Sequence, residues 1–175
     1  MTKLESTIIY LLSKAQERGK GDLSKFELFK LIYLLETESY RFTGGSFFGS
    51  SISFVRDKNG PISVEVYNAL GALKDNYITI MERKNEEYSH SRHCISLKKK
   101  VSKLALGDSE KMFINSIINS YGNLTIKHLK KIVYDTEPME EILSEEKKNG
   151  GVSKGAKIDF NCIRLDENLV DLIVN

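Results

Sequence analysis

The sequence predicts a mainly α-helical fold of the α+β class, in which a compact helical domain carries a small antiparallel β-hairpin. Apolar residues recur at three- and four-residue spacing in several stretches, which are separated by Gly, Pro and helix-capping residues. Two short runs, 77–81 and 93–97, have the pattern of strands instead. The 175 residues suit one domain. We expect 1–147 to form the helical domain and 148–175 to add a loop and a short closing segment to it.

Composition and charge limit the classes of protein to which the chain could belong. The chain carries 26 basic and 24 acidic residues, a net charge of +2. Nucleic-acid-binding proteins usually show a clear basic excess or a basic stripe, so this balance does not by itself predict one. Two cysteines, Cys94 and Cys162, are typical of reduced thiols in the cytoplasm. Because the sequence shows no signal peptide and no apolar run near the roughly 18 residues that span a membrane, we expect a soluble cytoplasmic protein with no membrane partner.

The first two helices have clear signals. One apolar face at helical spacing predicts a first helix, with Leu4, Ile8, Leu11, Leu12 and Ala15. The Gly-containing segment 18–21 ends it. Ser24 and Glu27 then fit a capping box, in which each side chain accepts the backbone N–H of the other residue. The helix that they open is apolar almost all round, with Leu28, Phe29, Leu31, Ile32, Leu34 and Leu35. Such a helix belongs in the core, so we expect it to be the central one.

The segment after the central helix is predicted to be a loop, a strand and a turn. Three glycines within 44–49 break the helical pattern. Residues 51–55 partly alternate, which predicts a short strand. Pro61 suits the first position of a third helix, where its missing N–H costs nothing, and apolar residues continue at helical spacing to Leu73.

The second half of the chain is predicted to hold the hairpin and further helices. The polar segment 83–91 is expected to be the hairpin loop. Asp108 and Thr125 are expected to cap two helices, and Pro138 to open another. The segment 147–157 is rich in Gly and Lys and is expected to be a mobile loop. Residues 158–162 alternate briefly, and Asp166 is expected to cap a short closing helix.

Catalytic and metal-binding patterns are weak. His90, His93 and Cys94 lie close together, but a structural zinc site usually needs two close pairs of ligands, and no second pair follows. The loop at 44–49 lacks the Gly-Lys-Ser/Thr ending of a phosphate-binding loop, and no Gly-x-Ser-x-Gly nucleophile elbow occurs. We therefore expect no catalytic residue, no metal and no cofactor. A small hydrolase or nuclease whose site is assembled in space remains an alternative.

Two basic clusters suggest a different function. They comprise Lys98, Lys99, Lys100 and Lys103, and Lys127, His128, Lys130 and Lys131. Such clusters form either a solvated charged face or contacts to nucleic-acid phosphates. A helix followed by a two-stranded ribbon is also the outline of a winged-helix module. A winged-helix-like transcriptional regulator, binding DNA at its own operator, is therefore the alternative function.

Aromatic residues gather around the Gly-rich loop: Tyr40, Phe42, Phe47, Phe48 and Phe54. They form either an exposed patch for a protein partner or a cap that folds back on the central helix. We expect Phe42 and Phe54 to fold back. Phe47 and Phe48 are adjacent and flanked by Gly, so we do not expect both to point inward.

Four short motifs resemble one protein family. They are Lys30-Leu31-Ile32-Tyr33-Leu34-Leu35, Thr43-Gly44, Gly60-Pro61-Ile62 and Val66-Tyr67-Asn68-Ala69-Leu70. Their order is similar to that of the Panacea domain, the SocA-like antitoxin domain. The resemblance covers about 5–147 and is specific only at 30–70. The chain has no Trp, whereas the family often has Ala-Trp before the Gly-Pro turn and Pro-Trp late in the domain. This departure indicates a divergent branch.

The resemblance implies a binding function without catalytic residues. Antitoxins of this family bind a cognate toxin and neutralise it, and one member delivers its toxin to a protease. The leading prediction is therefore a cytoplasmic antitoxin with a toxin protein as its partner. We expect the partner contacts at Tyr40, Phe42, Phe47, Phe48, Tyr67 and Lys154.

Overall fold

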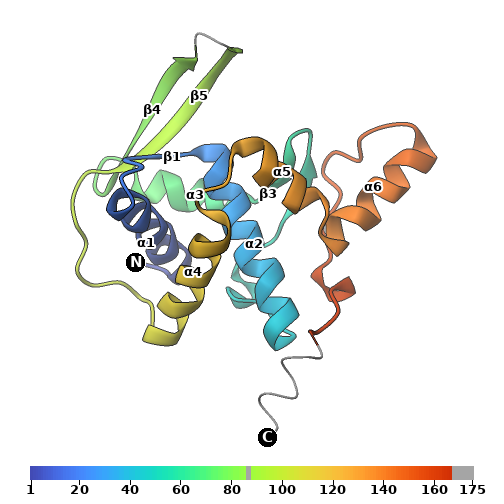
Figure 1. Ribbon diagram of the computed structural model, residues 1–175, viewed down its shortest axis with the longest axis horizontal. Coiled ribbons are helices and arrows are strands. Elements are labelled where there is room, and N and C mark those ends of the chain that lie inside the picture. Colours follow the sequence, from blue (N-terminus) through green and yellow to red (C-terminus); the bar gives the residue numbers. More distant parts are fainter. Residues whose placement is uncertain (86–87, 167–175) are drawn as a thin grey trace, which may run out of the picture.

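The helix α2 (Lys25–Thr43) runs through the middle of the molecule. The computed structural model describes residues 1–85 and 88–166. Around α2 lie α1 (Lys3–Glu17), α3 (Val64–Leu73), α4 (Asp108–Tyr121) and α5 (Ile126–Tyr134), while α6 (Glu137–Asn149) stands to one side (Figure 1). The predicted mainly helical α+β class is confirmed. None of the helices in these two ranges is long and apolar enough to cross a membrane.

Capping boxes start the first two helices. The Thr2 hydroxyl accepts the N–H of Glu5 while the Glu5 carboxylate accepts the N–H of Thr2, and Ser24 and Glu27 do the same for α2. Each pair satisfies two backbone donors that have no partner inside the helix. The whole stretch 27–39 of α2 is buried, so the predicted central helix is confirmed. Gly44, in the left-handed conformation with φ of 73°, ends it.

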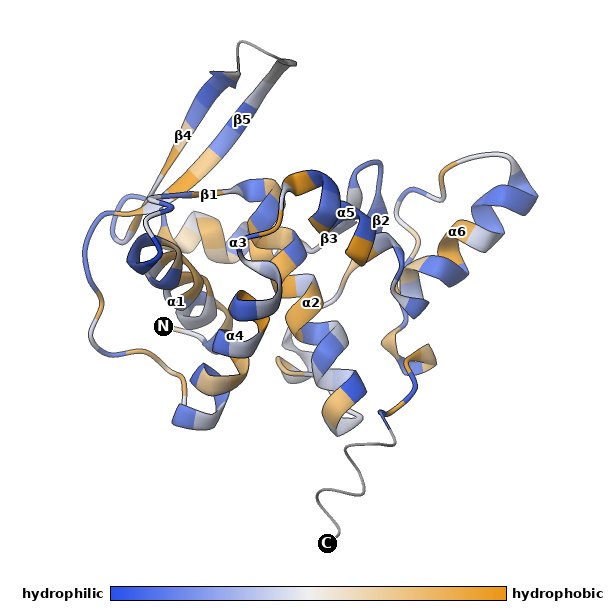
Figure 2. Ribbon diagram, viewed as in Figure 1, coloured by the Kyte–Doolittle hydropathy of each residue, from blue (hydrophilic) through white to orange (hydrophobic). Residues whose placement is uncertain are grey.

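The main hairpin is longer than predicted. Strands β4 (Ile78–Asn85) and β5 (Tyr88–Leu97) pair antiparallel, and β1 (Leu23–Ser24) adds to the other edge of β5. The hairpin projects from the helical body, and its strands are apolar near the body and hydrophilic beyond it (Figures 1 and 2). The loop predicted at 83–91 is wrong, since β5 already begins at Tyr88 and Arg83 and Lys84 continue β4. Because both side chains are exposed, backbone pairing there needs no apolar alternation.

A second, short hairpin replaces the strand predicted at 51–55. A 3-10 turn, η1 (Gly49–Ser51), comes first, and β2 (Val55–Asp57) then pairs with β3 (Gly60–Ile62). The prediction that Pro61 opens the third helix is wrong, since Pro61 lies in β3 opposite Arg56. Ser63 caps α3 instead, because its hydroxyl accepts the N–H of Val66 at 3.4 Å.

The other helix signals are confirmed with small shifts. Asp108 is the first residue of α4, which Gly107 precedes as cap, and Gly122 ends it. Thr125 caps α5, and Pro138 lies in the first turn of α6. The closing helix predicted after Asp166 lies outside the described residues.

The loop predicted at 147–157 is confirmed from Gly150 on and is wrong before it. Its first residues continue α6 to Asn149. Further on, the Gly155 N–H donates to the Arg56 carbonyl at 2.7 Å, and the Arg56 N–H donates to the Ala156 carbonyl at 2.8 Å. Beyond it, η2 (Phe160–Cys162) stands where the sequence alternates, and Phe160 is buried against Tyr33, Tyr40 and Phe54. Backbone hydrogen bonds to the β2 strand therefore hold this segment against the body.

One buried ion pair joins β2 to α6. The guanidinium of Arg56 donates two hydrogen bonds to the Glu146 carboxylate, at 2.9 and 3.2 Å, and both side chains are almost completely covered. The Arg56 bond holds the pKa of Glu146 below its ordinary value, against a smaller upward effect of burial. Glu146 also accepts the N–H of Ser153 at 2.9 Å. The pair therefore fixes both α6 and the segment that follows it.

We expect Arg56→Met to lower the free energy of unfolding by about 3 kcal/mol, because it leaves the Glu146 carboxylate buried without its partner. The matched control is Lys131→Met, which removes an exposed ion pair with Asp135 on α5 and is expected to cost at most about 0.5 kcal/mol. Urea denaturation of the two variants measures both losses. Equal losses would contradict the structural importance of the Arg56–Glu146 pair.

Candidate functional site

The Gly-rich aromatic loop is closed onto the body, contrary to expectation. Phe47 and Phe48 are 9% and 6% exposed, so both point inward. Their rings meet edge to face at 4.9 Å, and the Phe47 ring stacks on Phe113 of α4. The prediction that at least one of them faces solvent is wrong.

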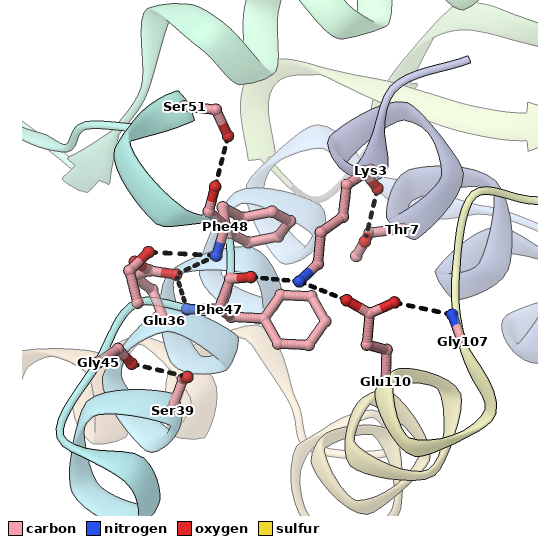
Figure 3. A network of polar contacts seen from close by, with 11 residues as sticks. Lys3, Thr7, Glu36, Ser39, Gly45, Phe47, Phe48, Ser51, Gly107 and Glu110 are labelled. Atoms are coloured by element: carbon pink, nitrogen blue, oxygen red, sulfur yellow. Dashed lines mark hydrogen bonds and ion pairs between the residues drawn. The ribbon is translucent and has the colours of Figure 1, made fainter.

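A buried carboxylate causes this closure. Glu36 of α2 accepts the backbone N–H groups of Phe47 at 3.1 Å and of Phe48 at 3.4 Å (Figure 3). Burial raises the pKa of Glu36, and the hydrogen bonds from Ser46, Phe48 and Phe47 oppose that shift. Lys3 donates to the Phe47 carbonyl and pairs with Glu110 at 2.6 Å. These bonds hold the loop against α1 and α2.

The other predicted contacts are spread over the surface. Tyr40 is half-buried and stacks on Phe160 at 5.4 Å. Phe42 is 39% exposed, so the expectation that it folds back is wrong, whereas Phe54 is buried as expected. Lys154 is exposed and lies 3.6 Å from the Asp57 carboxylate. The structure therefore does not gather the six predicted residues in one place, and binding at each of them stays a prediction.

Tyr67 lies in a hollow of the described surface whose lining is mostly apolar and includes several charged groups. We call it the α2 groove. It has a volume of about 550 Å³ and lies between the first turns of α2, the β2–β3 hairpin, α3, β5 and the start of α5. Its apolar lining is Phe26, Phe29, Ile62, Tyr67 and Ile126, and its charged or titratable lining is Lys25, Lys30, Asp57, Arg92 and His93. An apolar hollow with a few polar groups is the usual form of a binding site.

Lys30 is the unusual member of this lining. The residue is only 2% exposed, and its ammonium donates to the Asn59 carbonyl at 3.0 Å and lies 3.7 Å from the centre of the Phe26 ring. Gly60 makes room for it, since a Cβ at that position would lie 2.9 Å from the Lys30 Nζ. The two sequence motifs that contain Lys30 and Gly60-Pro61 therefore meet in one contact, between α2 and the β2–β3 turn.

The remaining cations of the groove also lack a full set of partners. The Lys25 ammonium lies 4.4 Å from the centre of the Tyr67 ring. Arg92 donates through Nη2 to Glu27 at 2.8 Å, but its Nε is buried without a hydrogen-bond partner among the residues that the structure describes. Glu27 itself accepts hydrogen bonds from Lys20 and Ser24. Burial raises the pKa of Glu27, but these bonds outweigh burial, so its pKa is lowered.

Burial of Lys30 has a large effect on its protonation. Loss of hydration, together with the smaller effects of the nearby charges of Lys130 and Arg56, lowers its pKa from 10.5 to about 7. Within residues 1–85 and 88–166, Lys30 forms no ion pair that would offset this. Desolvation disfavours the charged form of any buried lysine, so the groove holds a cation at a cost to folding.

Sequence reasoning missed Lys30 and Arg92 as site residues. A charged residue within an otherwise apolar helix was the available signal for Lys30. Among the residues whose side chains the structure describes, no group of His, Cys, Asp or Glu could hold a metal ion, and the His90 side chain of the sequence pattern at His90, His93 and Cys94 lies outside them. On α5, Lys131 pairs with Asp135, and the His128 ring is bonded to Thr125 at 3.0 Å.

We expect the pH dependence of stability to report the state of Lys30. Between its folded pKa of about 7 and its unfolded pKa of 10.5, the unfolded chain binds more protons. The loss of stability caused by burying the charged Lys30 is therefore complete below pH 7 and disappears as the pH rises towards 10.5. From pH 7 to pH 9, the wild type should gain about 2 kcal/mol relative to Lys30→Met. Urea denaturation at both pH values measures it, and an unchanged difference would contradict a buried, neutralised lysine.

We expect Gly60→Ala to destabilise the fold by about 2 kcal/mol, because φ at this position is +114° and the new methyl group meets Lys30 and Tyr134. Gly71→Ala is the matched control. Gly71 lies in α3 with open space around it, so this change should stabilise the protein by about 0.5–1 kcal/mol. Thermal unfolding of the two variants should shift in opposite directions, and a shared direction would contradict the close contact.

A family model identifies the relationship. The model for the antitoxin SocA-like Panacea domain matches residues 28–138, more than half of the chain. The match begins in α2, just before Lys30, and ends in the first turn of α6. No curated protein matches the sequence. The resemblance found in the motifs is confirmed, and the chain belongs to the SocA-like antitoxin family with a Panacea domain.

Proposed function

We propose that this protein is a cytoplasmic antitoxin that neutralises a cognate toxin protein by binding it. The single observation that carries the proposal is the family match over residues 28–138. A helical scaffold with fixed loops and an open groove supports it, since such a scaffold offers a preformed surface for a partner.

Neutralisation by association is a matter of mass action. When the free antitoxin concentration is 100 times the dissociation constant, only about 1% of the toxin remains unbound. No chemical step is needed, and the proposal assigns no catalytic residue and no cofactor. Residues 1–147 with the segment 148–166 are proposed to act as one scaffold, since Gly155 and Ala156 are hydrogen-bonded to Arg56.

DNA binding at the protein's own operator stays an alternative prediction. The β4–β5 hairpin projects from the body, as a wing would (Figure 1). The helix that directly precedes the hairpin is α3, however, and not the basic α5. Contacts through several lysines would weaken steeply with rising salt, whereas an interface with an apolar centre would not.

The test is a growth assay with the neighbouring gene. We expect its product to arrest growth when it is expressed alone, and growth to return when this protein is co-expressed. The two proteins should then co-purify in a fixed ratio, in both 150 mM and 500 mM salt. A harmless neighbour, or a toxic neighbour that neither binds nor is rescued, would overturn the proposal. Salt-sensitive binding to the upstream DNA would then favour the operator-binding alternative.

A further inference from the structure

We propose that the α2 groove binds a carboxylate side chain of the toxin, with Lys30 and Arg92 as the cations that receive it. The inference rests on the proposed antitoxin function and names the site and the chemistry of the partner segment. The occupant is an Asp or Glu that stands beside an apolar side chain on a protruding segment of the toxin.

The charges of the groove favour an anion. Its lining holds three permanent or potential cations, Lys25, Lys30 and Arg92, against the single carboxylate of Asp57. Asp57 is itself paired with Lys154. The lysine ammonium groups lie over the rings of Tyr67 and Phe26, and among the described residues neither forms an ion pair with a carboxylate. A carboxylate that enters the groove therefore meets cations whose hydrogen-bonding capacity is unused.

Two buried donors point to a missing acceptor. A lysine ammonium has three N–H donors, and the one hydrogen bond of Lys30 goes to the Asn59 carbonyl. The Arg92 side chain is 40% exposed, but its Nε is buried and makes no hydrogen bond with the described residues. Buried polar groups normally have partners, so unsatisfied donors from two separate elements around one groove need an explanation. A carboxylate ligand supplies the acceptors, and hydrogen bonds that involve two charged groups are the strong ones.

The apolar lining indicates a protein ligand. Phe26, Phe29 and Tyr67 form an aromatic wall, and Ile62 and Ile126 extend it. Aromatic and Arg side chains around a desolvated pocket are typical of interface hot spots. A nucleic-acid phosphate has no apolar group that could pack against this wall. The observations therefore favour an acidic and apolar segment over a phosphate.

The groove is also held in shape before any partner binds. The Lys30 bond to Asn59 fixes the β2–β3 turn, and the Arg56–Glu146 pair fixes the same hairpin from the other side. Arg92 is positioned by Glu27, whose carboxylate also holds Lys20. Preorganisation of this kind reduces the ordering cost of binding and so improves affinity.

The experiment measures the dissociation constant of the toxic product of the neighbouring gene for this protein and its variants. Lys30→Met should weaken binding on the order of 30-fold, the usual effect of losing one partner of a buried charge pair. Lys25→Met, which leaves the Asn59 contact intact, should weaken it several-fold. Lys111→Met, on α4 and outside the groove, is the matched control and should bind as the wild type does. Urea denaturation confirms that each variant is folded.

A double-mutant cycle separates direct contact from a change in the hairpin. Each Asp and Glu of the toxin is changed to Asn or Gln in turn. We expect one such change to weaken binding to the wild type strongly and to have little further effect on binding to Lys30→Met. If every toxin carboxylate behaves additively with Lys30→Met, the groove does not receive a carboxylate and the inference is overturned.

The failures of the two proposals are distinguishable. Tight binding of the toxin by wild type, Lys30→Met and Lys25→Met alike would overturn the groove inference and leave the antitoxin function standing. Absence of toxin binding by the wild type would overturn both. Loss of binding to a DNA duplex from the upstream region in Lys30→Met and Lys25→Met, with toxin affinity unchanged, would assign the groove to phosphate instead.

Discussion

The fold depends on buried charges along one helix. The stretch 27–39 of α2 is buried, so each charged group within it needs a partner inside the protein. Glu27 receives Lys20 and Arg92, and Lys30 holds the carbonyl of the β2–β3 turn. Glu36 receives the amides of the aromatic loop, and Glu38 receives Arg41 and Tyr121. Each buried charge therefore fixes a different surrounding segment, and α2 organises the molecule by polar as well as apolar contacts.

Local signals of the sequence were sufficient for the helices and insufficient for the site. Ser24 and Glu27 predicted where α2 begins, and its apolar residues predicted its burial, because capping and periodicity act over a few residues. Phe47 and Phe48 were judged by their neighbours alone, although Glu36 and Phe113 decide their burial through contacts that no local pattern reveals. Pro61 was placed in a helix because its fixed φ suits both a helix start and a strand. The lining of the α2 groove comes from α2, the β2–β3 hairpin, α3, β5 and α5, and only Tyr67 among these residues was predicted as a partner contact.

The structure favours the α2 groove over the aromatic loop as the candidate binding site. Aromatic residues were expected to mark a partner surface, yet most of them here complete the core around α2. An aromatic side chain contributes the same apolar area to a core as to an interface, so composition alone cannot separate the two roles. The two roles differ in whether the polar groups nearby have hydrogen-bond partners. Around Phe47 those groups are satisfied, whereas around Phe26 and Tyr67 the cations have spare hydrogen bonds.

Lys30 shows why such a group points to binding. A methionine at this position would fill much the same space without loss of hydration, and replacing buried ionic groups by apolar ones is often neutral or stabilising. The single hydrogen bond to the Asn59 carbonyl offsets only a small part of the cost of burying an ammonium group. Sites that bind ligands commonly hold such strain, because the interaction that relieves it is made by the partner. A cation that costs stability in the free protein and lines an open groove is therefore better explained by what enters the groove than by the fold that surrounds it.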